Sequence, residues 1–219
     1  MHFLKRIPLF YIYLVLDLIL SVVLLIIVSA IFSNYSFLYF IWNIFLAWIP
    51  LILSIRLYKV LSYKLWSSWE ALGLTFLWLL FLPNSFYMIS DFIHIANVPS
   101  NSVVYFTVIF TMIVFNALIV GNISVLMIHK QILKRITPRL SYVVIALILA
   151  ASSYAIYIGR VLRWNSWDLI TNPGGVIFDL SYQFSHFKLL LSSILIAGLF
   201  LIVLVIIYAL FYNIPKISE

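Results

Sequence analysis

Apolar residues form six long runs along the chain, and short polar or basic segments separate them. The runs cover residues 9–32, 37–55, 71–90, 103–128, 140–158 and 189–212. A bilayer core about 30 Å thick requires roughly 20 apolar residues in a helix, and each run is about that long. None of the runs alternates apolar and polar positions as the strands of a membrane barrel do. The pattern therefore predicts an all-α, polytopic transmembrane bundle of about six spanning helices, in a single integral membrane domain over residues 1–219.

The third run is the least regular, because Pro83 and Asn84 follow its first twelve residues. Twelve helical residues extend only about 18 Å, which is too short to cross the bilayer core. We therefore expect this helix to continue past Pro83, with a kink, as far as Ser90.

The first run allows two interpretations. Lys5 and Arg6 precede it and small residues occupy 28–30, as in a secretory signal peptide with its cleavage site. However, its apolar stretch of 24 residues is much longer than that of a signal peptide, and it contains Asp17. These features favour a first spanning helix that is not cleaved.

Composition agrees with a membrane location, since 66% of the residues are hydrophobic and only 9% are charged. A soluble domain is about half apolar and a quarter charged. These values exclude a soluble enzyme, a nucleic-acid-binding domain and a disordered chain. The absence of cysteine excludes disulfides and thiolate metal sites. Membrane lipids are the expected surroundings, and no nucleic acid partner is expected.

The net charge of +7 follows the order of the runs. With six spans, one side of the membrane carries ten basic residues: Lys5, Arg6, Arg56, Lys59, Lys64, Lys130, Lys134, Arg135, Arg139 and Lys216. The opposite side carries Arg160, Arg163 and Lys188. Because basic loops stay in the cytoplasm, the sequence predicts a plasma membrane protein with its N-terminus and C-terminus both cytoplasmic.

One of the basic segments also contains aromatic residues. Arg56, Lys59 and Lys64 are followed by Trp66 and Trp69. Lysines that meet lipid headgroups and rings at headgroup depth are typical of a helix lying at the membrane interface. We expect such a helix here.

Polar residues on the predicted outer side concentrate in two segments. In the first, Asn84, Tyr87, Asp91 and His94 follow one another at steps of three, four and three residues. An α-helix would align these four side chains as one stripe. The stripe begins where the third run leaves the membrane.

The second polar segment begins at the end of the fifth run. Ser153, Tyr157, Arg160, Trp164 and Trp167 also have helical spacing. Because both segments leave the membrane on the same side, we expect them to converge on one outward-facing site.

These segments resemble the signatures of a bacterial integral membrane family known only as a domain of unknown function 1361. The residues concerned are Phe81-Leu82-Pro83-Asn84-Ser85-Phe86-Tyr87, Ser90-Asp91-Phe92-Ile93-His94 and Gly159-Arg160-Val161-Leu162-Arg163-Trp164-Asn165-Ser166-Trp167-Asp168. The family tends to have Ala-Pro after the Pro-Asn pair and Thr before the Asp, where this chain has Ser85-Phe86 and Ser90. The resemblance extends from the second run to the sixth and implies a multi-pass membrane fold, but no activity.

The two arginines of the second segment are candidates for anion binding. Arg160 and Arg163 lie about one helical turn apart beside Trp164, so their guanidinium groups could bind a phosphate or carboxylate. The alternative is structural, with either arginine paired to Asp91 or Asp168. The candidate ligand-binding residues are Asn84, Tyr87, Tyr157, Arg160, Arg163, Trp164, Asn165, Trp167 and Asp168.

Asp91 and His94 are candidate catalytic residues, as a general base or as metal ligands. Zinc would need a third ligand from His186, Asp168 or Asp179. The alternative makes Asp91 an ion-pair residue and His94 a hydrogen-bonding residue, and we expect no metal and no cofactor. The chain also lacks the known short motifs of zinc proteases, serine hydrolases and nucleotide-binding loops.

Asp17 is an intramembrane polar residue of the first run. A carboxylate inside the membrane suggests a proton or cation relay. It could equally be a neutral acid that is hydrogen-bonded to Asn43 or Asn116 on a neighbouring helix.

The last outer loop, residues 159–188, is long for a small bundle and contains Pro173-Gly174-Gly175. We expect these three residues to form a surface turn. A lid or a re-entrant turn is the alternative.

Three classes of function remain open from the sequence. The one favoured is an outward-facing polar and aromatic site that binds or transports a small anion or an anionic lipid headgroup. The second is a membrane enzyme acting on a lipid-linked substrate at the outer surface, with Asp91 or His94 in the reaction. The third is a structural or accessory membrane subunit. The sequence identifies no protein partner.

Overall fold

The computed structural model describes residues 2–217, and it describes the side chains of residues 9–213. The long helices are α1 (His2–Ile31), α2 (Phe40–Val60), α3 (Trp69–Tyr87), α4 (Val103–Leu133), α5 (Pro138–Tyr157) and α8 (Phe187–Ile217). The short elements are the 3₁₀ helix η1 (Met88–Asn97), the π-helical turn η2 (Ile158–Leu162), α6 (Asp168–Thr171) and α7 (Pro173–Ser185). Within the described residues, six helices are long and apolar enough to cross a membrane, which confirms the all-helical, multi-pass fold.

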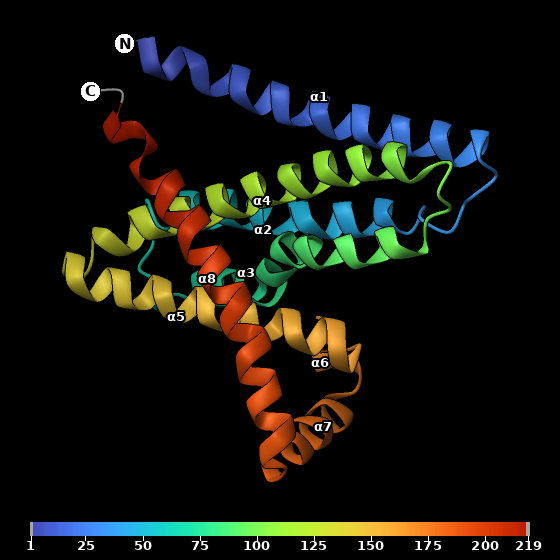
Figure 1. Ribbon diagram of the computed structural model, residues 1–219. Coiled ribbons are helices and arrows are strands. Elements are labelled where there is room, and N and C mark those ends of the chain that lie inside the picture. Colours follow the sequence, from blue (N-terminus) through green and yellow to red (C-terminus); the bar gives the residue numbers. More distant parts are fainter. Residues whose placement is uncertain (1, 218–219) are drawn as a thin grey trace.

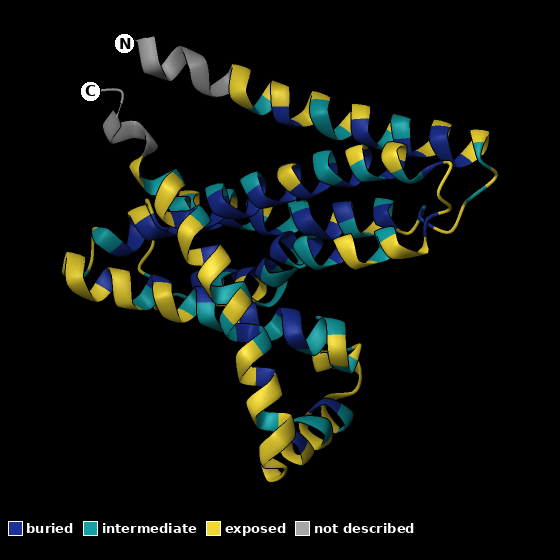
Figure 2. Cartoon of the chain, viewed as in Figure 1, coloured by how far each residue is buried: buried dark blue, intermediate teal, exposed yellow. Residues whose placement is uncertain are grey.

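Helix α4 is the centre of the bundle (Figure 1). It contacts α1, α2, α3, α5, α8 and η1, while α2 packs against α3 and α5 packs against α8. Helix α7 lies beside the start of α8, away from α1 and α2. Helices α2 and α4 carry many buried residues, whereas α8 is largely exposed (Figure 2). The exposed apolar side chains are those that would face lipid tails.

Polar side chains join the helices inside the bundle. The indole of Trp78 in α3 donates to Ser124 of α4 at 2.6 Å, and Ser85 of α3 donates to the carbonyl of Ala47 in α2 at 2.6 Å. Lipid tails are as apolar as leucine, so helices in a membrane associate through close packing and hydrogen bonds. These bonds fix α3 against α2 and α4.

Helices α4 and α3 approach each other closely at Gly121. A Cβ atom at this position would lie 2.7 Å from the Cβ of Ser85 and 2.9 Å from Cε1 of Phe86. By contrast, a Cβ on Gly198 of α8 would meet nothing within 4 Å. The absent side chain of Gly121 therefore makes room for the hydrogen bond of Ser85 to α2.

The polar end of α3 differs from a continuous α-helix. As expected, Pro83 lies inside α3 without ending it. The helix extends beyond the expected end at Ser90, and it narrows to a 3₁₀ helix from Met88 to Asn97. Because Pro83 has no N–H, the carbonyl of Leu79 lacks its usual helical donor.

The prediction of an interface helix from Arg56 to Trp69 is wrong. Helix α2 continues to Val60, and turns and bends follow it up to Ser68, whose hydroxyl accepts from Ala71 N and begins α3. Arg56 and Lys64 both pair with Glu70 in the first turn of α3. The basic residues therefore belong to the ends of spanning helices and to the loop between them.

The prediction of a surface turn at Pro173-Gly174-Gly175 is also wrong, because these residues begin the 13-residue helix α7. The Asn172 side chain accepts a hydrogen bond from Gly175 N at 3.1 Å, and Pro173 occupies the first helical position. Proline is favoured there because its N–H would be unpaired in any case.

The predicted side of the membrane for each terminus rests partly on Lys5, Arg6 and Lys216, which lie outside the residues whose side chains are described. The cytoplasmic location of the two termini stays a prediction.

The approach at Gly121 can be tested with one added methyl group. Gly121→Ala should lower the free energy of unfolding by about 1–3 kcal/mol, because the new Cβ collides with Ser85 and Phe86. The matched variant Gly198→Ala should be neutral or slightly stabilising, since alanine is the better helix former. Thermal unfolding of both variants in one mild detergent checks this, and equal midpoints would contradict the tight approach.

Candidate functional site

The two polar segments of the sequence meet through Arg160, which lies in η2 at the end of α5. Its guanidinium forms an ion pair with Asp91 of η1. It also donates to the Ser90 hydroxyl, with Nε at 3.0 Å and Nη2 at 2.7 Å. Its Nη1 lies 2.9 Å from Nε2 of His94, and its carbon atom Cζ lies 4.4 Å from the centroid of the Tyr87 ring. Arg160 therefore holds η1 against the end of α5.

The local helix types explain this geometry. In a 3₁₀ helix, side chains three residues apart lie one above the other, so Asp91 and His94 of η1 face the same way. At η2, α5 widens to a π-helical turn, and Arg163 then ends the helix with a φ of 62°. The helical spacing expected from Ser153 to Trp167 therefore stops at Arg163.

Asp91 is the most deeply placed charged group of the site. It is 1% exposed, while the side chain of Arg160 is 19% exposed. Its second oxygen, Oδ2, lacks a hydrogen bond of normal length within the described residues, although the side-chain amide of Asn43 also interacts with this carboxylate. A buried carboxylate requires a paired cation, and Arg160 supplies it.

His94 acts as an acceptor in this arrangement. An arginine N–H can only donate, so Nε2 of His94 accepts from Arg160 and the ring proton is on Nδ1. The imidazole is then neutral, and its 3.8 Å separation from Asp91 is not an ion pair.

Tyr39, the residue before the start of α2, borders the same cluster. Burial, followed by the negative charge of Asp91, raises the pKa of the Tyr39 hydroxyl above its usual value. Tyr39 is thus a neutral hydrogen-bonding group at physiological pH.

A second set of hydrogen bonds joins the loop after η2 to the bundle. Asn84 of α3 donates through Nδ2 to the Ser166 hydroxyl at 3.1 Å. The Trp164 indole donates to Asp179 of α7 at 2.8 Å. Further along α7, Gln183 donates to the hydroxyl of Tyr157 at 2.8 Å. Helix α7 and its preceding loop are therefore fixed over the polar end of the bundle.

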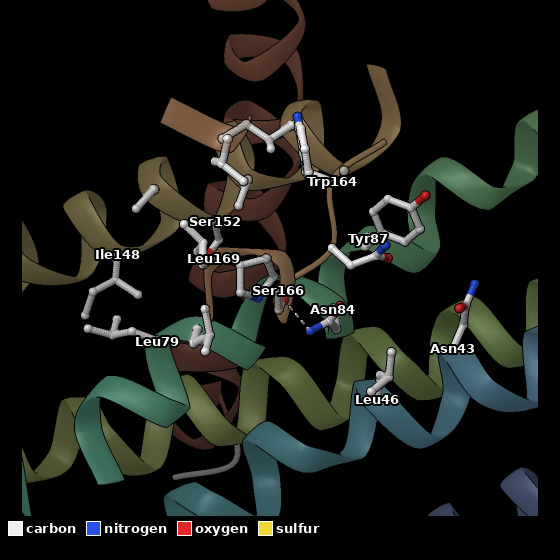
Figure 3. Close-up of a pocket in the computed structure, with 18 of the residues that line it drawn as sticks. Asn43, Leu46, Leu79, Asn84, Tyr87, Ile148, Ser152, Trp164, Ser166 and Leu169 are labelled. Carbon is white, nitrogen blue, oxygen red and sulfur yellow. Dashed lines mark hydrogen bonds between the residues drawn. The ribbon is translucent and has the colours of Figure 1, made fainter. Parts of the chain in front are cut away.

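A cavity of about 490 Å³ lies beneath this loop, between α2, α3 and α5 (Figure 3). Its size is that of an ordinary small-molecule site. Apolar side chains and backbone form one part of the wall: Leu46, Leu79, Leu80, Pro83, Ile148, Ala151, Ala155, Ile158, Gly159, Leu169, Val176 and Leu180. The polar and aromatic part consists of Tyr39, Asn43, Asn84, Tyr87, Ser152, Trp164, Asn165 and Ser166. No lining residue carries a charge.

The structure separates the predicted ligand-binding residues into two groups. Asn84, Tyr87, Trp164 and Asn165 line the cavity. The others do not: Tyr157 is buried against Gln183, Arg160 is paired with Asp91, Asp168 accepts from the Asn165 backbone N–H at 2.6 Å, and Arg163 and Trp167 are exposed. The ion pair of Arg160 with Asp91, which the structural interpretation predicted, is present. Anion binding by these arginines stays a prediction.

Sequence reasoning missed four polar lining residues. Tyr39, Asn43, Ser152 and Ser166 complete the wall of the cavity. Asn43 and Ser152 are isolated polar residues within apolar runs, which is a usable signal, because a polar side chain inside a spanning helix generally faces protein or a cavity.

The residues considered as a third metal ligand do not join Asp91 and His94. Throughout the described part of the chain, no three His, Asp or Glu side chains come together as a metal site would require. His186, for example, is exposed and its Nδ1 lies 2.7 Å from the carbonyl of Tyr182.

A family model described as "Protein of unknown function (DUF1361)" matches residues 42–207. The chain belongs to this family. No curated protein and no solved structure matched the chain. In this DUF1361 protein the matched residues include η1, η2 and all of the cavity wall except Tyr39.

Asp17 of the DUF1361 protein belongs to a separate polar contact. Asn116 of α4 donates through Nδ2 to Asp17 Oδ2 at 2.8 Å and to the carbonyl of Leu14 at 2.9 Å. The indole of Trp48 in α2 donates to Asn116 Oδ1 at 3.0 Å. Of the two partners expected for Asp17, Asn116 is therefore the one in contact, and Asn43 instead lines the cavity.

The ion pair yields a prediction for the stability of the DUF1361 protein. Arg160→Gln should lower the free energy of unfolding by about 3–5 kcal/mol, because it leaves Asp91 buried without its cation. Asp91→Asn should also destabilise, and the double variant should lose less than the sum of the two single losses. Arg163→Gln is the matched control, since Arg163 is exposed and forms no ion pair within the described residues. Additive losses in thermal unfolding would show that the two residues act independently.

Proposed function

We propose that this DUF1361 protein binds a membrane lipid in the cavity, with the lipid headgroup under the loop after η2 and the tail along α3 and α5. The observation that carries this proposal is the shape of the cavity, which joins a polar end to an apolar wall inside the bundle. Of the two ligands that the sequence suggests, a small free anion would use only the polar end. A lipid would use both.

The depth of the cavity supports a lipid. Its lining on α5 and η2 extends from Gly159 to Ile148, which is about 16 Å along a helix. Its lining on α3 extends from Tyr87 to Leu79, about 12 Å. One leaflet of the bilayer core is about 15 Å thick, so the cavity matches the depth of a single leaflet.

The cavity is also accessible from the side that would face lipid. Leu79 of α3 is 42% exposed and Leu169 of α6 is 51% exposed, yet both line the cavity. Ala151 of α5 is likewise exposed and lines it. A lipid tail could therefore reach the cavity between α3 and α5 without leaving the membrane.

The ion pair between Arg160 and Asp91 has a supporting role in this proposal. It holds Tyr87, Asn43 and Tyr39 at the rim, because these three residues surround the paired groups. A structural contact and a binding site therefore share one end of the bundle.

We further propose that the polar end faces the outside of the cell, as the distribution of basic residues predicts. The chain has no cysteine, so single cysteines report the side directly. In whole cells, Ser100→Cys, in the exposed loop after η1, should react with a membrane-impermeant maleimide. Ser67→Cys, in the exposed loop before α3, should react only after permeabilisation. The reverse pattern would place the cavity in the inner leaflet.

Filling the cavity tests lipid binding. Ala155→Trp places an indole in the cavity and should remove lipid that copurifies with the protein, because the tail and the indole cannot share the space. Leu147→Trp is the matched control on the same helix, since Leu147 is 64% exposed and does not line the cavity. Native mass spectrometry of the wild type and both variants, released from their own membranes, measures the bound lipid. Equal lipid retention in all three proteins would refute the proposal.

A further inference from the structure

The polar end of the cavity contains several hydrogen-bonding groups whose capacity is not fully used by other described residues. We infer that the lipid headgroup it receives is uncharged and rich in hydroxyl groups, as in a glycolipid. This inference rests on the proposed function and specifies the ligand class of the same site. It depends on what each lining side chain can still donate or accept.

Asn84 and Ser166 provide a matched acceptor and donor. Asn84 uses Nδ2 for the Phe81 carbonyl and for Ser166 Oγ, both at 3.1 Å, so its Oδ1 remains free to accept. Ser166 accepts that bond, so its hydroxyl proton remains free to donate. An acceptor and a donor on neighbouring side chains suit a ligand hydroxyl, which does both.

Asn43 adds another acceptor at the rim. Its amide interacts favourably with the carboxylate of Asp91, which requires the N–H side of the amide. The oxygen Oδ1 of Asn43 is then left for the cavity. Asp91 itself does not line the cavity.

The aromatic residues fit a ring-shaped headgroup. Trp164 lines the cavity and its indole is held by Asp179, so the position of the ring is fixed. A fixed flat apolar face can pack against the C–H face of a sugar. Tyr39 and Tyr87 also line the cavity. Few anchors of this kind are needed to orient a ligand in an otherwise apolar pocket.

The absence of charge in the wall disfavours an anionic headgroup. No lysine, arginine or histidine lines the cavity, and the nearby guanidinium of Arg160 is already neutralised by Asp91. Burying a phosphate without a cation is strongly unfavourable, whereas a hydroxyl group needs only hydrogen bonds. The observed donors and acceptors therefore select a neutral headgroup over a charged one.

A competition between three lipids with identical acyl chains tests the inference. The full-length protein is reconstituted in vesicles that contain equal amounts of a monoglucosyl diacylglycerol, a phosphatidylglycerol and an unmodified diacylglycerol, and native mass spectrometry then measures the bound lipids. We expect the glucosyl lipid to be enriched about tenfold over each of the others, the factor given by one or two net hydrogen bonds. Enrichment of the phosphatidylglycerol, or equal binding of all three, would overturn the neutral headgroup and leave lipid binding intact. If no lipid is retained, the proposed function itself fails.

Variants separate headgroup recognition from general lipid binding. Ser166→Ala and Asn43→Leu should each reduce the preference for the glucosyl lipid severalfold while diacylglycerol binding is kept. Asn97→Leu is the matched control, because Asn97 is exposed at the end of η1 and does not line the cavity. Unchanged preference in both cavity variants would show that these side chains do not recognise the headgroup. Two variants are used so that poor folding of one does not remove the test.

Discussion

The ion pair between Arg160 and Asp91 determines the arrangement of the whole polar end. Each partner alone would be unfavourable in a region with little water, and together they connect η1 to the end of α5. Ser90, His94 and Tyr87 complete the coordination of the guanidinium, so its donors are almost fully used. The cavity lies beside this neutral cluster, and its wall is uncharged because the charges have already been paired.

The same rule governs the rest of the bundle. A polar group inside a membrane has no water to bond, so it is stabilised by a partner within the protein, on its own helix or on another. Asn116 of α4 forms hydrogen bonds with Asp17 and Trp48, and Ser124 of α4 forms one with Trp78. Helices α1, α2 and α3 are therefore all hydrogen-bonded to α4. At the opposite end of α4 from η1, His129 lies between the hydroxyls of Tyr208 and Ser141 and joins α5 and α8 in the same way. The few polar residues of this apolar chain thus specify which helices are neighbours.

Hydrophobic runs predicted the spanning helices well, because the bilayer fixes their length and composition regardless of tertiary contacts. The convergence of the Asp91 and Arg160 segments was also predictable, since topology alone puts them at one end. The sequence could not predict that η1 is 3₁₀ or that η2 is π-helical, because these forms differ from an α-helix by one hydrogen-bond step that depends on packing. It could not predict the cavity either, whose wall collects residues from six helical elements and from the segments before α2 and after η2. The start of α7 was predictable in principle from Asn172 and Pro173, which form a recognisable cap and first turn.

The π-helical turn η2 makes the ion pair depend on chain length as well as on residue identity. An α-helix rotates by about 100° per residue, and a π-helical turn holds one additional residue compared with an α-helical turn. Without that residue, the side chain at position 160 would point about a quarter of a turn away from Asp91. A chain one residue shorter between 158 and 162 could therefore keep both the aspartate and the arginine and still lose their contact. For related chains, the spacing from the end of α5 to this arginine carries as much information as the arginine itself.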